Sequence, residues 1–433
     1  MMLHVYYLTP RQWLCVLLCS IATVLLAAVP IESSGSSKIV DLSQEWALGT
    51  LYNQNKAYCT LQSYLNPVNT IGYVVIQNGE ILAEGYTEGY ERNGTYDAWS
   101  VTKSWSSVII GKMVEQDLLD TAETLNDIFD QEADWENVKQ AESKKTITVE
   151  ELLTFTGGLE EIDCGLTTNL IIGFDWDIGI WPQRSFEQVM NAVTYKSEIR
   201  GTFKYLARIH IFSRIIERRT GLTPREFVIE NQIFEKMGIK ESEYNWIATD
   251  GIEGTAYGLQ MNPRQIAKLG QLYLQGGLVK EGEQLIPSEW VEMSTTNFLD
   301  EPSRGVVPDL PGYGYQWYIA ADETKNTNIN GRLENAVGAA GAEGQRLLYL
   351  PASNTVIAIM CTGANGPVSS QLLLDNILDQ LDDLHVEQTE CDKSFNWFRY
   401  GVKNAIPLAS RAVQIIPNFV STRLMCAADI FHL

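Results

Sequence analysis

The chain has 433 residues, of which 45% are hydrophobic and 10% aromatic. This composition excludes a disordered chain and supplies enough apolar surface for one large domain or two interleaved domains. The 54 acidic residues outnumber the 32 basic ones and give a formal net charge of -22, which argues against nucleic acid and anionic lipid headgroups as partners.

The N-terminus has the pattern of an export signal. Arg11 precedes an uncharged apolar run over 13–29, and Pro30 and a small polar stretch over 33–37 follow it. The run is long for a signal peptide and slightly short for a spanning helix, so residues 1–30 are either a cleaved signal peptide or an uncleaved anchor, with a buried core helix as the alternative. We expect an extracytoplasmic protein that is secreted, periplasmic or membrane-anchored.

The cysteines fit an exported protein without defining a disulfide framework. Five of the seven follow the N-terminal segment, and they are Cys59, Cys164, Cys361, Cys391 and Cys426. This odd number, without a CxxC pair, allows one or two disulfides and predicts no pairing. The triplet that begins at Asn93 would permit N-glycosylation in a eukaryotic source.

The first elements expected in chain order are a hairpin and a helix. Two β-rich runs, 71–77 and 80–86, flank an Asn-Gly turn, which is typical of a β-hairpin. Apolar residues then recur at spacings of three and four between Ser100 and about Leu119. This spacing predicts a helix that begins near Ser100.

The middle of the chain reads as helices, and strands return near the end. Helical patterns cover 149–156, 185–193, 209–220, 224–236 and 263–275, and a last one covers 371–384. The runs 345–350 and 356–361 predict a second hairpin. We therefore expect an α/β (α+β) fold, with one sheet built from both ends of the domain, flanking helices, and a helical subdomain inserted over about 120–300.

These elements give the domain organisation. A linker over 31–52 precedes the folded domain over 53–386, and a basic, aromatic C-terminal extension covers 387–433. The extension could lie on a membrane surface, like the N-terminal segment, although a packed or partly disordered tail is the reading that we favour.

The residues that carry chemistry begin at Ser100. In the motif Ser100-Val101-Thr102-Lys103 the serine and the lysine are three apart, so they share one face of the helix. A desolvated Lys103 could take the proton of the Ser100 hydroxyl, and free N–H groups at the helix N-terminus could stabilise an oxyanion. The alternative is a helix-capping serine beside an exposed lysine.

Five further segments accompany this motif in order. They are 151–159 (ELLTFTGGL), 201–205 (GTFKY) leading into 215–221, 258–270 leading into Gly276-Gly277, 313–317 (YGYQW) and 338–345. Together with the SxxK motif, they resemble the β-lactamase-related serine hydrolases, and more closely the branch of esterases, D-aminopeptidases and 6-aminohexanoate-dimer hydrolases. The resemblance covers about 72–384.

The resemblance implies a β-lactamase/transpeptidase-like fold and a set of roles. Tyr205 would be a second acid/base that relays a proton to the leaving group. Ala342 would complete an oxyanion hole with the backbone N–H of Ser100, on an edge strand, and Gly341 would let the substrate approach closely. The implied substrate is a small-molecule ester or amide, and neither cofactor nor metal is expected.

Four departures from the family pattern narrow the expected substrate. Ala207 and Ala339 stand where relatives often carry polar groups that grip the substrate, Gly157 replaces a serine, and Arg200 replaces a proline. The loss of these two polar contacts with the substrate argues for an esterase or amidase that acts on less charged substrates. A D-amino-acid peptidase or weak β-lactamase stays open, as does a non-catalytic binding protein on the same fold.

Other catalytic arrangements lack support in the sequence. No G-x-S-x-G motif accompanies the four histidines, and His210 is expected to serve packing. Scattered histidines without an H-x-x-x-H motif give no metal ligand set. Aromatic residues over 163–181, among them Trp176, are either a cleft wall that favours apolar acyl groups or core packing.

Overall fold

The computed structural model describes residues 38–65, 69–161, 185–300, 302–303, 307, 310–320, 333, 335–363 and 365–387. The chain divides into two compact units, Met1–Lys38 and Ile39–Leu433, and the second is described below. The expected signal, the aromatic segment over 163–181 and all of the C-terminal extension except Glu387 lie outside the described residues. No described helix combines the length and the apolar character that a membrane crossing needs.

An eight-stranded sheet forms the centre of the domain, in the order β1-β3-β2-β17-β16-β15-β14-β13. Its strands are β1 (Ala47–Leu48), β2 (Thr70–Gln77), β3 (Glu80–Tyr86), β13 (Gly312–Tyr313), β14 (Tyr318–Ile319), β15 (Val337–Gly341), β16 (Gln345–Leu350) and β17 (Thr355–Cys361). All neighbours in the sheet are antiparallel except β1 and β3.

Both predicted hairpins are confirmed, and they meet at the middle of the sheet. Asn78 and Gly79 have φ values of 53° and 82°, which suit a two-residue turn between β2 and β3. β16 pairs with β17, and β17 pairs with β2 along its length, so that Thr355 lies opposite Gln77. The sheet is therefore built from both ends of the domain, as the sequence predicts.

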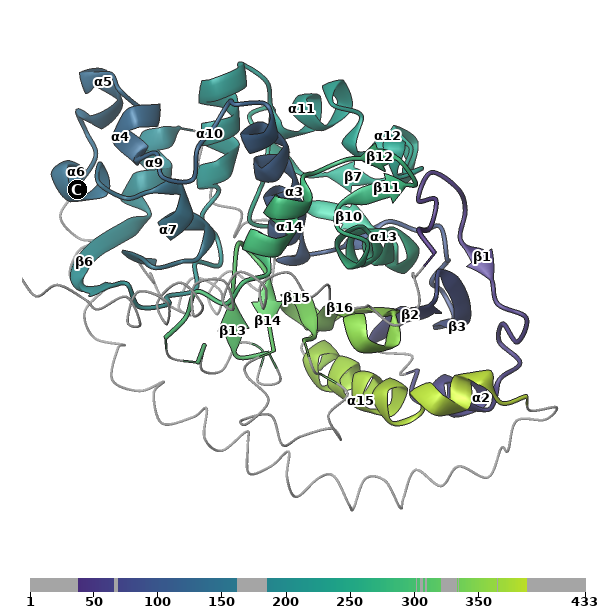
Figure 1. The fold of residues 1–433 in the computed structure, drawn as a ribbon. Coiled ribbons are helices and arrows are strands. Elements are labelled where there is room, and N and C mark those ends of the chain that lie inside the picture. Colours follow the sequence, from purple (N-terminus) through teal and green to yellow (C-terminus); the bar gives the residue numbers. More distant parts are fainter. Residues whose placement is uncertain are drawn as a thin grey trace, which may run out of the picture. The chain divides into compact units, whose positions relative to one another are not determined.

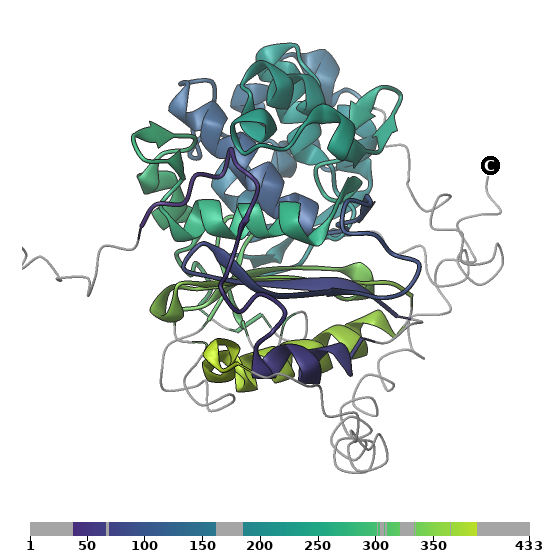
Figure 2. The ribbon, with the colours of Figure 1, turned by 90° about the vertical axis from the view of Figure 1, so that its right-hand side faces the viewer.

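Helices cover both faces of this sheet (Figure 1, Figure 2). On one face α13 (Pro263–Leu274) packs on β2, β16 and β17, and α3 (Val101–Glu115) packs on β15 and β16. On the other face α15 (Gly366–Asp379) packs on the same central strands and contacts α2 (Lys56–Gln62). Because both faces are covered, β17 is buried along its whole length.

The residues between β3 and β13 form the expected helical insertion. Its remaining helices are α4 (Leu125–Ile128), α5 (Glu132–Trp135), α6 (Ala141–Lys144), α7 (Val149–Leu153), α9 (Phe186–Asn191), α10 (Ile211–Thr220), α11 (Pro224–Glu230), α12 (Ile233–Lys236) and α14 (Ser288–Ser294). Its strands are short and form small sheets, β4 (Tyr96–Asp97) with β10 (Leu259–Met261) and β7 (Asn245–Trp246), and β5 (Gly157–Glu161) with β6 (Val193–Arg200).

Three helix boundaries differ from the predicted ones for local reasons. The pattern over 224–236 is two helices, because Gln232 adopts a left-handed conformation with φ 53°. The pattern over 149–156 ends at Leu153, and Phe155 follows with φ 56°. The last helix begins earlier than predicted, at Gly366, where a proline in the first turn suits a helix start.

Part of the predicted linker packs against the domain. Leu42 and Trp46 are buried, and β1 pairs with β3. The buried Lys268 of α13 donates hydrogen bonds to the carbonyl oxygens of Leu42, Gln44 and Met237 at 2.9, 3.2 and 2.6 Å. Residues 42–48 are therefore held to α13 and to the sheet.

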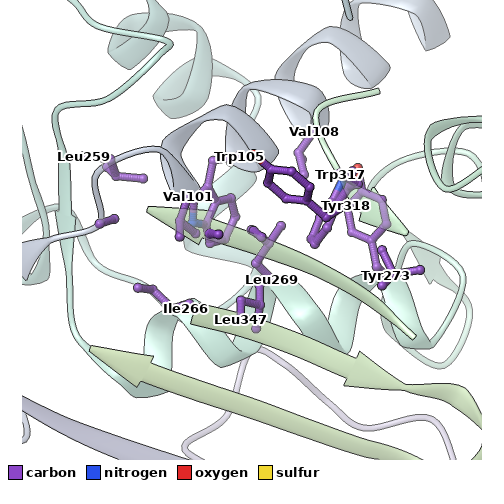
Figure 3. Close-up of a cluster of buried hydrophobic side chains, with 14 of the residues drawn as sticks. Val101, Trp105, Val108, Leu259, Ile266, Leu269, Tyr273, Trp317, Tyr318 and Leu347 are labelled. Carbon is purple, nitrogen blue, oxygen red and sulfur yellow. The ribbon is translucent and has the colours of Figure 1, made fainter. Parts of the chain in front are cut away.

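Helix α3 lies between the sheet and the helical insertion and is buried on nearly every side. Val101, Trp105 and Val108 project from it into a cluster that also contains Leu347 of β16 and residues of α13 (Figure 3). Every residue from 101 to 111 is buried, and the buried hydroxyls of Ser104 and Ser106 donate to backbone carbonyl oxygens, so α3 is a core helix. The residues at its start are therefore carried on a rigid element.

Candidate active site

The start of α3 brings Ser100 and Lys103 together. Ser100 precedes the helix with φ -68° and ψ -5°, and its side chain makes no capping hydrogen bond. Lys103 is only 3% exposed, and its Nζ lies 3.2 Å from the Ser100 Oγ. The alternative of a capping serine beside an exposed lysine is therefore wrong.

Besides its contact with Ser100, the Lys103 amine donates hydrogen bonds to two backbone carbonyl oxygens. Nζ lies 2.8 Å from the carbonyl oxygen of Ala207 and 2.9 Å from that of Ala256. Burial lowers the pKa of Lys103 to about 7, although the nearby carboxylate of Glu161 acts to raise it. A neutral amine has two N–H groups and one lone pair, so two carbonyls leave the lone pair for the Ser100 hydroxyl.

Tyr205 completes the cluster around Ser100. Its ring centroid lies 5.1 Å from the Lys103 Nζ, and its ring packs edge-on against Phe155 at 5.3 Å. Burial raises the pKa of Tyr205 to about 12, while hydrogen bonding with the hydroxyls of Ser100 and Tyr318 acts to lower it. The phenol is thus protonated at neutral pH and can donate a proton near Ser100.

The end of β15 lies beside the nucleophile loop. A Cβ added to Gly341 would lie 2.7 Å from the Ala98 carbonyl oxygen and 2.9 Å from the Trp99 Cβ, so only glycine lets the strand come this close. Trp99 itself adopts φ 47° before Ser100. This close approach brings the backbone that leads into Ala342 next to the Ser100 loop.

The predicted edge strand is only partly at an edge. β14 pairs with Val337 and Gly338 of β15 and with no later residue of that strand. Within the described part of the chain, Ala339, Ala340 and Gly341 therefore have no strand neighbour on that side, whereas β16 pairs with all three on the other. The half of β15 nearest Ser100 thus pairs with a described strand on one side only.

The four residues that depart from the family pattern lie in different structural surroundings. Ala207 contributes its backbone carbonyl to Lys103, and Ala339 is buried at 3% exposure. Arg200 binds both carboxylate oxygens of Glu151 at 2.6 and 2.8 Å, and so ties the end of β6 to α7. A Cβ on Gly157 would lie 2.8 Å from the Ile147 side chain, which leaves little room for the usual serine.

Neither described histidine resembles the base of a catalytic triad. The Nδ1 of His210 accepts a hydrogen bond from the Ala256 N–H at 3.1 Å, and burial lowers the pKa of His210 to about 3. His385 interacts with Gln77 on the central sheet. Among the described His, Cys, Asp and Glu residues, no group of three or more could hold a metal ion.

Sequence reasoning missed two contributors to this site. The Ala256 carbonyl acts through the backbone, so its side chain gives no signal. Glu161 gives no signal of its own in a chain with 54 acidic residues, although its carboxylate influences both Lys103 and Tyr205. Its position at the end of β5, paired with β6, could be read only from the fold.

Comparisons with known proteins show the family of the chain. The family model described as Beta-lactamase matches residues 68–382. A 6-aminohexanoate-dimer hydrolase from Paenarthrobacter ureafaciens is 22% identical over 312 residues, which are 69% of this chain and 74% of that protein.

Solved structures share the fold. One is named "Putative 6-aminohexanoate-dimer hydrolase from Bacillus anthracis", with a TM-score of 0.59, 20% identity, and coverage of 81% of this chain and 92% of the other. Another is EstCE1, a hydrolase with promiscuous acyltransferase activity, with a TM-score of 0.57, 13% identity, and coverage of 75% and 97%. With the family model matching most of the described domain, the chain belongs to the beta-lactamase family of serine hydrolases.

Proposed function

We propose that the protein hydrolyses a small-molecule ester or amide through an acyl-enzyme on Ser100. The observation that carries this proposal is the buried Lys103 amine, whose pKa is about 7 and whose Nζ lies 3.2 Å from the Ser100 Oγ. A lysine that is neutral near physiological pH can act as a general base, whereas an ordinary surface lysine cannot.

The chemistry follows from the positions of these groups. Lys103 takes the hydroxyl proton as Ser100 Oγ attacks the substrate carbonyl, and the backbone N–H groups of Ser100 and Ala342 stabilise the oxyanion. Tyr205 passes a proton to the leaving alcohol or amine as its bond to the acyl carbon breaks. Water then attacks the acyl-enzyme, gives a proton back to the site and releases the acid.

The side chains around the site favour a substrate without a carboxylate handle. Ala207 and Ala339 offer no charged or amide group, while Phe203, Tyr205 and Tyr318 supply aromatic surface. An uncharged ester or amide loses little water on entering such a site. The 6-aminohexanoate-dimer hydrolase of Paenarthrobacter and the hydrolase EstCE1, with its promiscuous acyltransferase activity, are in keeping with chemistry at an acyl bond. A 6-aminohexanoate dimer has a terminal carboxylate, so the preference for an uncharged substrate rests on Ala207 and Ala339 alone.

Export of the protein is a further part of the proposal. Cys59 is disulfide-bonded. Disulfides persist in oxidising compartments, and the apolar run over 13–29 suits an export signal. We therefore favour an extracytoplasmic enzyme that is secreted, periplasmic or anchored.

Two active-site probes test the chemistry. The purified protein and Ser100→Ala are each treated with a fluorophosphonate and with a fluorescent penicillin. Labelling of the parent by the fluorophosphonate alone supports an esterase or amidase, and labelling by penicillin as well supports the peptidase or weak β-lactamase alternative. A folded parent that neither probe labels would leave the non-catalytic binding protein as the better reading.

A further inference from the structure

His210 lies directly before α10, and its imidazole faces the backbone that receives Lys103. Its Nδ1 accepts a hydrogen bond from the Ala256 N–H at 3.1 Å, and the Ala256 carbonyl oxygen lies 2.9 Å from the Lys103 Nζ. All three groups are buried. From this chain of contacts we infer that His210 is a positioning residue, which holds the Ala256 carbonyl against Lys103 and so aims the lysine lone pair at Ser100.

The rest of this segment is fixed independently of His210. Ser213 of α10 donates to the Glu253 carbonyl at 2.7 Å, and Ser106 of α3 donates to the Thr255 carbonyl at 2.8 Å. The indole of Trp246 donates to the Gly254 carbonyl at 2.8 Å. The Thr255 carbonyl and the Ala256 N–H belong to one peptide unit, of which Ser106 holds the carbonyl and His210 holds the N–H. Together they place Ala256, whose own carbonyl begins the next peptide unit.

The protonation state of His210 suits this role over the whole working range. Nδ1 can accept a hydrogen bond only when it carries no proton, which places the ring proton on Nε2. Burial, with the positive charges of Lys103 and Arg214 facing the ring, lowers the pKa of His210 to about 3. The imidazole is therefore a constant acceptor and does not switch near neutral pH.

Packing is the competing explanation for the same residue. The His210 ring meets the Tyr257 ring edge-on at 4.7 Å, and a Cβ on Gly254 would lie 2.7 Å from its Cε1. A purely structural His210 would need its size and shape, whereas a positioning His210 needs an acceptor at the place of Nδ1. Substitutions can separate these two requirements.

The inference rests on the proposed function, so the same fluorophosphonate reaction is the readout. His210→Asn keeps an acceptor oxygen near the position of Nδ1 and loses the ring. His210→Gln carries the same amide but places its oxygen nearer the position of Nε2, and His210→Phe keeps the ring without any acceptor. Circular dichroism and thermal unfolding establish that each variant is folded.

We expect His210→Asn to retain the limiting labelling rate within about fivefold, and His210→Phe and His210→Gln to lose about 100-fold, the cost of a 1 Å misplacement of a reacting group. The loss should lie in the limiting rate and not in the probe concentration for half-saturation. Retention by His210→Phe with loss in His210→Asn would assign His210 to packing and overturn the inference, as would equal rates or equal losses in all three folded variants. A parent that is not labelled, or a labelled Ser100→Ala, would overturn the proposed function itself.

Discussion

Lys103, Lys144 and Lys268 are all buried, and each donates to backbone carbonyl oxygens. Lys268 meets three carbonyls, which match the three N–H groups of an ammonium. Lys103 meets two carbonyls and a serine hydroxyl, which accept three N–H bonds from an ammonium and, once the amine is neutral, two N–H bonds with the lone pair turned to the hydroxyl. Burial lowers the pKa of Lys144 and Lys268 to about 8, so a low pKa alone does not mark the reactive lysine. The feature that distinguishes Lys103 from the other two lysines is the Ser100 hydroxyl beside its amine.

The pH dependence of labelling tests the state of Lys103. Because the neutral amine is the base and its pKa is about 7, the fluorophosphonate labelling rate should rise about tenfold per pH unit below 7 and level off above it. The second-order rate constant between pH 5 and 9 measures this. A rate that is flat across this range, or that falls as pH rises, would argue against Lys103 as the base.

Tyr205→Phe should separate proton donation from nucleophilic attack. The variant keeps the ring contacts with Phe155 and loses the phenol. An amide leaving group needs a proton and a nitrophenolate does not, so we expect the variant to slow hydrolysis of a neutral anilide on the order of 100-fold more than hydrolysis of the matching nitrophenyl ester. An equal loss of rate on both substrates would show that Tyr205 does not protonate the leaving group.

At the scale of elements, the site depends on the approach of β15 to the loop before α3. Gly341 lets the strand come within van der Waals distance of Ala98 and Trp99, while β14 stops short of this part of the strand. The geometry of the proposed oxyanion donors, the N–H groups of Ser100 and Ala342, is thus set by packing between two elements.

Gly341→Ala should therefore impair the reaction more than the fold. Its new methyl group would push the end of β15 away from Trp99, and a misplaced oxyanion donor costs about 100-fold or more in rate. Gly338→Ala is the matched control, since Gly338 lies in the same strand, β15, but farther from Ser100. A Cβ at Gly338 would be similarly crowded, 2.7 Å from the carbonyl oxygen of Leu347 in β16. Labelling rates and melting temperatures of both variants check this. Similar labelling losses in both would indicate general damage to the strand.

The sequence predicts those elements whose signals are local. An Asn-Gly turn specifies the first hairpin, and the spacing of apolar residues marks the start of α3. The division between α11 and α12 could not be predicted, because the left-handed residue there is Gln232 and not glycine. The pairing of β5 with β6 is likewise invisible, since residues 162–192 separate the two strands in sequence.

The candidate site divides in the same way. Ser100 and Lys103 follow from a spacing rule and Tyr205 from resemblance, and the structure brings all three together. The contribution of Ala256 could not be predicted, because a carbonyl oxygen is common to every residue type and only the tertiary fold aims it. His210 was visible in the sequence, but only its distance from Ala256 suggests a role.

At the scale of the whole molecule, the ends of the domain are fastened to its body. Residues 42–48 are held by Lys268 and β1, and Glu387 forms a bridge with Asn55 beside α2. Cys59 within α2 is disulfide-bonded. The margins of the domain are thus held to its body by hydrogen bonds and strand pairing.

Reduction of the disulfide at Cys59 should lower the stability of the domain. A native disulfide contributes about 2–4 kcal/mol, mainly by restricting the unfolded chain. We expect the parent to lose several degrees of melting temperature in reductant, and Cys59→Ser to start lower and to be insensitive to reductant. The free, buried Cys361 provides the control, since Cys361→Ala should keep the sensitivity. An unchanged parent in reductant would show that the link does not limit stability.

The pairing of β2 with β17 also limits when the central sheet can form during synthesis of the chain. The two strands meet through residues 278 to 291 positions apart, from Gln77 with Thr355 to Thr70 with Cys361. On the ribosome the hairpin of β2 and β3 emerges first, and the apolar edge of β2 waits unpaired while the whole helical insertion is made. Such distant pairing slows folding and prolongs exposure to aggregation. A chain cut short before β17 would lose its central strand, so a nonsense change even near residue 350 should abolish the enzyme altogether.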